Sequence, residues 1–76
     1  MAVGKELLDF LVDTGATYSV LNTKLAKKTS RSTLVTGVSG ESQNHSFLQL
    51  LECQWGDLTL KHSFLYLPEC PIPLLG

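Results

Sequence analysis

The chain has 76 residues, enough for one small domain, and 43% of them are hydrophobic, as is usual in globular proteins and unusual in disordered chains. Six basic and seven acidic residues give a net charge of −1, so the composition indicates no nucleic-acid partner and no membrane surface. No apolar run approaches about 18 residues, the length of a membrane span. The N-terminal residues lack the apolar stretch of a signal peptide. We therefore expect a single domain over 1–76 that is not secreted.

The two cysteines, Cys53 and Cys70, are too few for a secreted disulfide scaffold. One bridge between them is conceivable, but reduced thiols in an intracellular protein are favoured. With His62 they offer no Cys-x-x-Cys or His-x-x-x-His pair and no fourth ligand. We predict no metal and no cofactor.

Short apolar runs separated by Gly, Pro and polar clusters predict an all-β domain. The first strands are expected at 7–12 and 18–21. The polar and basic segment 22–32 reads as a loop or a single helical turn. Leu34 and Val35 then lead into Gly37-Val38-Ser39-Gly40, which suits the tip of a flexible hairpin.

The second half of the chain continues the strand pattern. Strands are expected at 47–53, at 58–61 after a turn at 55–57, and at 63–67, where Pro68 stops the last one. Pro71 and Pro73 exclude a regular ladder beyond it, and the chain closes on Leu-Leu-Gly.

The stretch FLVDTGATYSVL, residues 10–21, places one carboxylate at the end of an apolar strand. Residues 10–12 are apolar on both faces, so we expect this strand to be covered from both sides, with Asp13 at the edge of a dry core. Gly15 permits a tight turn and a close approach of other backbone. Asp-Thr-Gly also occurs as an ordinary turn, so the three residues alone leave both interpretations open.

The order of features adds to the motif: an apolar strand, Asp-Thr-Gly-Ala, a second apolar strand, a Gly-rich hairpin and a closing apolar-apolar-Gly. In this order the chain resembles the retropepsins, the aspartic proteases of retroviruses and endogenous retroviral elements, and most of all the gammaretroviral type. FLVDTGATYSVL and HSFLYLPECPIPLLG carry the resemblance, which runs over nearly the whole chain. The middle, 24–60, matches in spacing more than in residues.

The resemblance implies a retropepsin-like, partly closed β-barrel that carries half of an active site. It implies a homodimer in which Asp13 of each copy faces the other, acting on peptide or polyprotein substrates in the cytoplasm or inside a virus-like particle. Amide hydrolysis requires a base to activate water and an acid to protonate the carbonyl oxygen and the leaving amine. Two carboxylates a few ångströms apart share one proton and supply both roles.

The same resemblance assigns roles to the neighbours of Asp13. Thr14 lies beneath the dyad and bonds across the dimer axis, and Gly15 lets the backbone approach the carboxylates. Ala16, where pepsin-like enzymes often have a hydroxyl residue, leaves the dyad one donor fewer.

Two further segments receive roles from the resemblance. Residues 36–46 correspond to the flap, a hairpin that folds over bound peptide, with Thr36, Gly37, Val38, Ser39 and Gly40 at its tip. Leu74, Leu75 and Gly76 form the segment that packs against the active-site loop.

Members of the family continue past this segment into a short helix and a C-terminal strand that helps to join the dimer. We therefore expect 1–76 to lack both elements. Besides an active endopeptidase, two interpretations stay open: a catalytically silent retropepsin-like binding module, and a truncated endogenous-retroviral remnant.

Overall fold

The computed structural model describes residues 1–13, 15–37 and 39–76. The regular structure of these residues is entirely β, in ten strands, which confirms the all-β prediction. Among the described residues no helix has the length and apolar character needed to cross a membrane.

A four-stranded sheet is formed by two hairpins. Its strand order is β2-β1-β7-β8, antiparallel throughout. The turns of the two hairpins contain Gly4 at φ 60° and Gly56 at φ 59°, a left-handed backbone that favours glycine. The strands are β1 (Ala2–Val3), β2 (Glu6–Leu7), β7 (Leu51–Trp55) and β8 (Leu58–His62).

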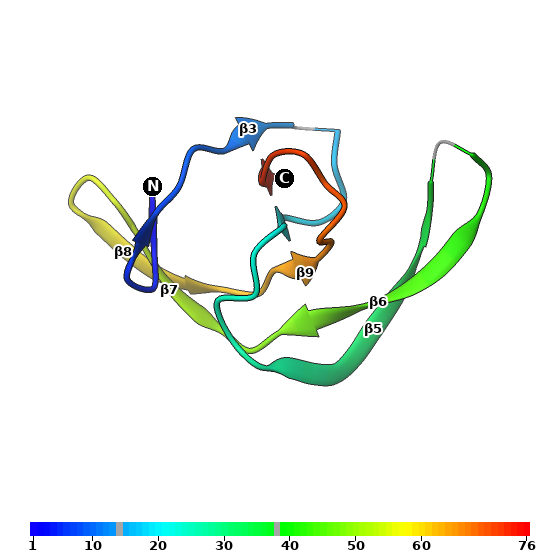
Figure 1. Cartoon of the computed structure of the whole chain (residues 1–76). Coiled ribbons are helices and arrows are strands. Elements are labelled where there is room, and N and C mark those ends of the chain that lie inside the picture. The colour runs from blue at the N-terminus through cyan, green and yellow to red at the C-terminus, as the bar shows by residue number, and fades with distance from the viewer. Residues whose placement is uncertain (14, 38) are drawn as a thin grey trace.

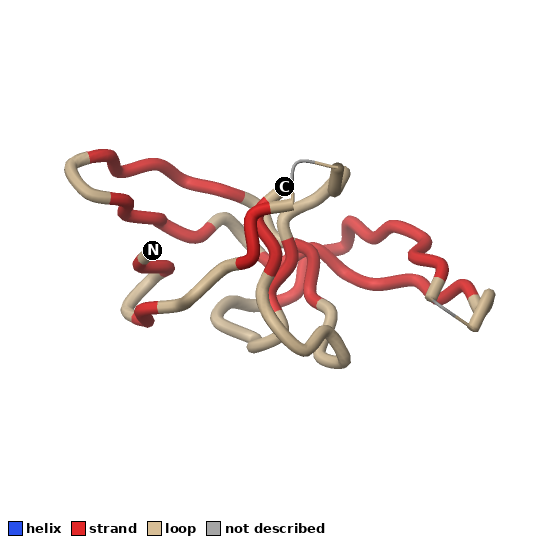
Figure 2. Tube along the Cα trace, turned by 90° about the horizontal axis from the view of Figure 1, so that it is seen from above, coloured by secondary structure: helices blue, strands red, loops and turns tan. Residues whose placement is uncertain are grey.

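The second sheet has six strands, in the order β3-β10-β4-β9-β6-β5, and it includes both the strand that precedes Asp13 and the strand formed by Leu74 and Leu75. Figure 2 shows the β5–β6 hairpin of this sheet and the β7–β8 hairpin of the other sheet projecting in opposite directions from the middle of the molecule. The strands are β3 (Leu11–Val12), β4 (Val20–Leu21), β5 (Lys28–Thr36), β6 (Ser42–Leu48), β9 (Leu65–Tyr66) and β10 (Leu74–Leu75).

The core consists of two apolar clusters. Because apolar burial is the main favourable term in folding, these clusters fix how the sheets meet. The larger cluster contains side chains from both sheets, whereas the smaller cluster contains side chains of β4, β6 and β9 in the six-stranded sheet. Cys53, in the larger, is fully buried, and this burial raises the pKa of its thiol. The larger cluster contains Val3, Leu21, Leu48, Leu51, Cys53 and Phe64, and the smaller contains Val20, Phe47 and Leu65.

The expectation that residues 10–12 are covered from both sides was wrong for the single chain. Leu11 is 53% exposed and Val12 is 62% exposed. The reason is topological: within the described residues β3 is the outermost strand of its sheet and pairs with β10 alone. An apolar edge strand is a site for association with another surface.

The segment 22–32 is not a loop or helical turn throughout, because β5 already begins at Lys28. Its polar side chains find partners on the strand next to it. The Thr29 hydroxyl donates to the carbonyl oxygen of Phe47 at 2.9 Å, and the Arg31 guanidinium lies 4.8 Å from the centre of the Phe47 ring.

Two of the expected strands are each divided in the structure. The strand expected at 47–53 becomes the end of β6 and the start of β7, because the chain passes from one sheet to the other at Gln49, whose amide donates to Lys27 O at 2.9 Å. The strand expected at 7–12 becomes β2 and β3. The β1–β2 hairpin, with its turn at Gly4, was not predicted.

Candidate active site

Asp13 follows β3 directly and is held through its backbone. Its amide donates to the carbonyl oxygen of Leu75 at 2.9 Å, and its own carbonyl oxygen accepts from the amide of Ala16 at 3.0 Å. The amide of Gly15 donates to Asp13 Oδ1 at 3.1 Å. Asp13 is exposed to solvent. Its main chain is held by hydrogen bonds to Leu75 and to Ala16.

The closing apolar-apolar-Gly segment lies beside this loop. β10 pairs in parallel with β3, with Leu74 opposite Leu11 and Leu75 opposite Val12. Figure 1 shows the two strands together at the top of the molecule. Gly76 comes even closer to the loop, since a Cβ atom at this position would stand 2.9 Å from the carbonyl oxygen of Ala16.

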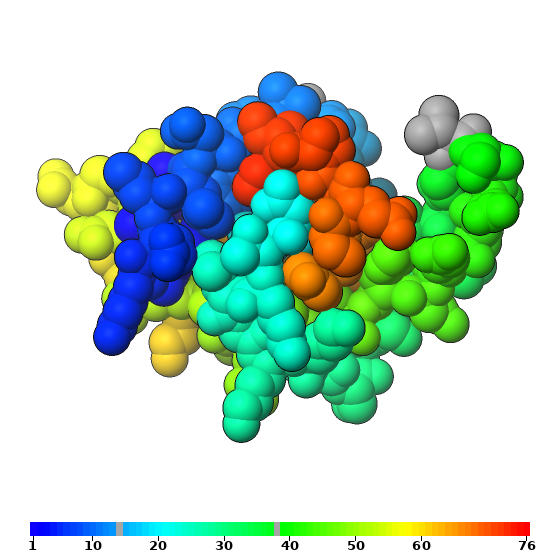
Figure 3. Space-filling model, in the orientation of Figure 1, coloured from blue at the N-terminus to red at the C-terminus, as the bar shows by residue number. Residues whose placement is uncertain are grey.

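A cleft of about 340 Å³ separates residues 16–18, which follow Asp13 in the chain, from the β5–β6 hairpin. Figure 3 shows the surface hollowed between the green hairpin and the orange and red C-terminal segment. Most of its lining is apolar, and all of it comes from the six-stranded sheet and the segments next to its strands. The lining residues are Ala16, Thr17, Tyr18, Val20, Leu34, Val35, Thr36, Leu65, Leu67 and Leu74.

The hairpin that borders the cleft ends in a tight turn. Gly37 N donates to Glu41 O at 2.8 Å, and Gly40 N donates to Gly37 O at 3.0 Å. Gly40 has φ 84°, in the left-handed region that glycine adopts without strain. Ser39 is exposed at this turn. A pocket of about 110 Å³ with mixed polar and apolar walls lies at the same end, lined in part by Glu41, His45 and Glu69.

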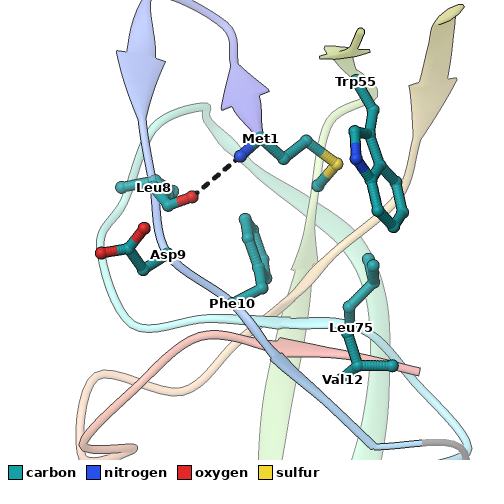
Figure 4. Close-up of a pocket in the computed structure, with 7 residues that line it drawn as sticks. All are labelled: Met1, Leu8, Asp9, Phe10, Val12, Trp55 and Leu75. Atoms are coloured by element: carbon teal, nitrogen blue, oxygen red, sulfur yellow. Dashed lines mark hydrogen bonds between the residues drawn. The ribbon is translucent and has the colours of Figure 1, made fainter.

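A further hollow, of about 190 Å³, lies on the other face of the β3–β10 pair. Side chains alternate along a strand, so Leu74 lines the cleft while Leu75 lines this pocket. Figure 4 shows Leu75 and Val12 beneath the indole of Trp55, with the N-terminal amine of Met1 bonded to Leu8 O at 3.1 Å. This face of the β3–β10 pair is therefore open and partly apolar, with the carboxylate of Asp9 among the groups that line it.

The structure thus gathers Asp13, Gly15, Ala16, Leu74, Leu75 and Gly76 at one place. Of the residues expected at the hairpin tip, Thr36 lines the cleft, Gly37 and Ser39 line the smaller pocket, and Gly40 lies in the turn. Thr14 and Val38 lie outside the described residues. Among the residues described, no three His, Cys, Asp or Glu side chains form a group that could hold a metal ion.

Sequence reasoning missed one polar residue near Asp13. Ser19 is buried next to the loop and bonds to both His62 and Gly76. A signal was present, because a serine inside the apolar run Tyr18-Ser19-Val20-Leu21 must find a hydrogen-bond partner once it is buried.

A carboxylate turn that is bonded to an apolar-apolar-Gly strand and lies across a cleft from a glycine-rich hairpin is the arrangement typical of aspartic proteases. The family model for "Retroviral aspartyl protease" matches residues 1–76, and the chain belongs to this family.

Several viral polyproteins contain a segment similar to this chain. The Gag-Pol polyprotein of feline leukemia virus is 42% identical over 76 residues, which is 100% of this chain. That of gibbon ape leukemia virus is 45% identical over 69 residues, or 91% of the chain. That of baboon endogenous virus (strain M7) is 41% identical over 76 residues, again 100% of the chain. The chain spans about 4% of the length of each polyprotein.

Proposed function

We propose that this chain supplies one half of the active site of an aspartic endopeptidase of retroviral type, which hydrolyses peptide bonds in extended polypeptide. The observation that carries the proposal is the placement of Asp13. Its carboxylate is exposed on a loop tied to β10, and residues 16–18, which follow in the same loop, line the cleft. Membership of the retroviral aspartyl protease family supports the same chemistry.

The mechanism requires a second carboxylate, which Asp13 of another copy provides. Two carboxylates brought together cannot readily both ionise, so they share one proton. The ionised member takes a proton from the attacking water, and the protonated member donates to the carbonyl oxygen of the scissile bond. Leu74 and Val20 line the cleft in which an extended peptide would lie next to this pair.

The surface beside Asp13 supports a symmetric homodimer. Leu11 and Val12 immediately precede Asp13, and both are more than half exposed in the single chain. Trp55 and Leu58 add further exposed apolar area on the neighbouring sheet. An apolar face of this kind is typical of a surface that associates with another copy.

The names of the relatives support one class of substrate. The matched segments lie within proteins named Gag-Pol polyprotein. We propose that the natural substrates are polyproteins of this kind, cleaved in the cytoplasm or inside a virus-like particle.

The variant Asp13→Asn tests the proposal, because it keeps the shape of the side chain and removes its ionisable group. We expect peptide hydrolysis to fall by more than about a hundredfold, the range of general acid–base catalysis. Circular dichroism and sedimentation should show the same fold and the same oligomeric state as the wild type. Chelators should have no effect on the wild type, whose activity should peak below neutral pH.

Undiminished cleavage by a folded Asp13→Asn protein would eliminate the dyad. If neither protein cleaves and the wild type binds extended peptides, the chain is a silent binding module of the same fold. If it neither cleaves nor binds peptide, it is a remnant without present function.

A further inference from the structure

Ser19 is a buried polar residue, 4% exposed, at the point where the active-site loop enters β4. Its hydroxyl oxygen accepts a hydrogen bond from the amide of Gly76 at 3.2 Å. The same oxygen lies 3.0 Å from His62 Nε2. A serine hydroxyl has one proton and two lone pairs, so it can accept from Gly76 and bond to His62 at the same time.

The group that Ser19 holds is the peptide unit between Leu75 and Gly76. The carbonyl oxygen of this unit accepts from the amide of Asp13 at 2.9 Å, while its N–H donates to Ser19. A peptide unit is planar and rigid, so the direction of its N–H fixes the direction of its C=O. A contact on the Ser19 side of the unit is therefore transmitted to the backbone of Asp13.

His62 lies at the end of β8, in the other sheet, 43 residues from Ser19 along the chain. Its ring packs edge-on against Phe64, with the centroids 5.0 Å apart and the planes at 85°. Phe64 is fully buried in the larger cluster. The imidazole thus has a fixed support, and it orients a hydroxyl that would otherwise rotate.

We propose that His62 is a positioning residue for Asp13, acting through the Ser19 hydroxyl and the Leu75–Gly76 peptide. It ties the active-site loop to the four-stranded sheet and holds the carboxylate of Asp13 in place for its partner. The consequence for catalysis rests on the proposed function, whereas the fixing of the loop backbone does not.

Amide hydrogen exchange, followed by NMR, tests the positioning without any need for activity. The probes are the amides of Asp13 and Gly76, with the amide of Leu48, bonded to Phe64 O at 2.9 Å, as the internal reference. In Ser19→Ala and His62→Leu, both probe amides should exchange about fivefold faster relative to Leu48, the factor that corresponds to one hydrogen bond.

A matched pair of polar substitutions makes the test specific for the contact. The amide of Gln reaches about as far as Nε2 of histidine, whereas the amide of Asn ends near the position of Nδ1. His62→Gln should therefore keep the protection of Asp13 and Gly76, and His62→Asn should lose it. Thr29→Val, which removes a comparable hydroxyl bond to Phe47 O, should leave the ratio of the probe amides to Leu48 unchanged.

Equal protection of Asp13 and Gly76 in the Gln and Asn variants would overturn the proposal. Kinetics of the active wild type form a second arm. In His62→Asn, kcat should fall by about tenfold with KM little changed, because misplacement of a catalytic group affects the chemical step. In His62→Gln, kcat should stay close to the wild-type value. A wild type without activity would contradict the proposed function and leave the exchange result to decide the role of His62.

Discussion

Gly76 lies directly against the carbonyl group of Tyr18: a Cβ atom at position 76 would stand 2.9 Å from the oxygen and 3.1 Å from the carbon of that group. Real side chains essentially never come so close to backbone. Glycine is therefore required here for space, and the close approach lets the amide of Gly76 reach the Ser19 hydroxyl.

The variant Gly76→Ala should be strongly destabilised, because the added methyl group meets backbone atoms that cannot rotate away. We expect the free energy of unfolding to fall by roughly 1–3 kcal/mol, as for overpacking of a well-packed site. Urea denaturation followed by circular dichroism measures this change. Gly37→Ala is the control, since its Cβ would meet only Glu41 O at 3.8 Å, an ordinary contact, and its stability should stay within about 1 kcal/mol of wild type.

The exposed apolar face at β3 predicts how self-association responds to charge. Val12→Asp should abolish dimer formation at micromolar concentration without loss of fold, because Val12 is 62% exposed in the single chain and lies in the face that we propose to be buried in the dimer. Leu50→Asp is the matched control, since Leu50 is 63% exposed and lies between β6 and β7. Sedimentation velocity distinguishes the two. A dimer that tolerates Asp at position 12 would place the interface elsewhere.

Cys53 gives a prediction for alkaline pH. Burial raises the pKa of its thiol in the folded state, so rising pH removes the proton from the unfolded chain first. The contribution of the Cys53 thiol to the free energy of unfolding is fully present below the ordinary pKa of a thiol. It is lost as the pH rises through the pKa of the folded state. Between about pH 8 and pH 10 this group should lower the free energy of unfolding by at most about 1.4 kcal/mol per pH unit.

The matched variants Cys53→Ala and Cys70→Ala isolate that contribution. Cys70→Ala retains Cys53 and should show the wild-type fall in stability with pH, whereas Cys53→Ala should show a shallower one. Equal slopes in the two variants would mean that Cys53 does not control the alkaline transition.

The features of this fold that are local in sequence could be predicted from the sequence. Alternation and turn residues indicate an all-β chain, and the glycines at 37 and 40 mark the turn between β5 and β6. The features that depend on distant partners could not. Residues 10–12 look like a buried strand, and only the pairing with β10 shows that they form an edge.

The same limit applies at the candidate site. Asp13 stands out because a carboxylate follows an apolar strand, and the family resemblance supplies its neighbours. The contact between Ser19 and His62 joins two sheets across 43 residues, and no local pattern links them. Thr29 likewise lies in a strand where a loop or helical turn was predicted, because its partner Phe47 on β6 is 18 residues away in the sequence.

Mixing wild type with Asp13→Asn tests most directly whether two copies of Asp13 form one active site. At a total concentration where both proteins are dimeric and exchange subunits, only a dimer of two wild-type chains has two carboxylates. Activity per wild-type chain should then fall to about one half in a 1:1 mixture and about one quarter in a 1:3 mixture, by random pairing. Activity per wild-type chain that stays constant in both mixtures would show that a single copy of Asp13 is sufficient, and would contradict the shared dyad.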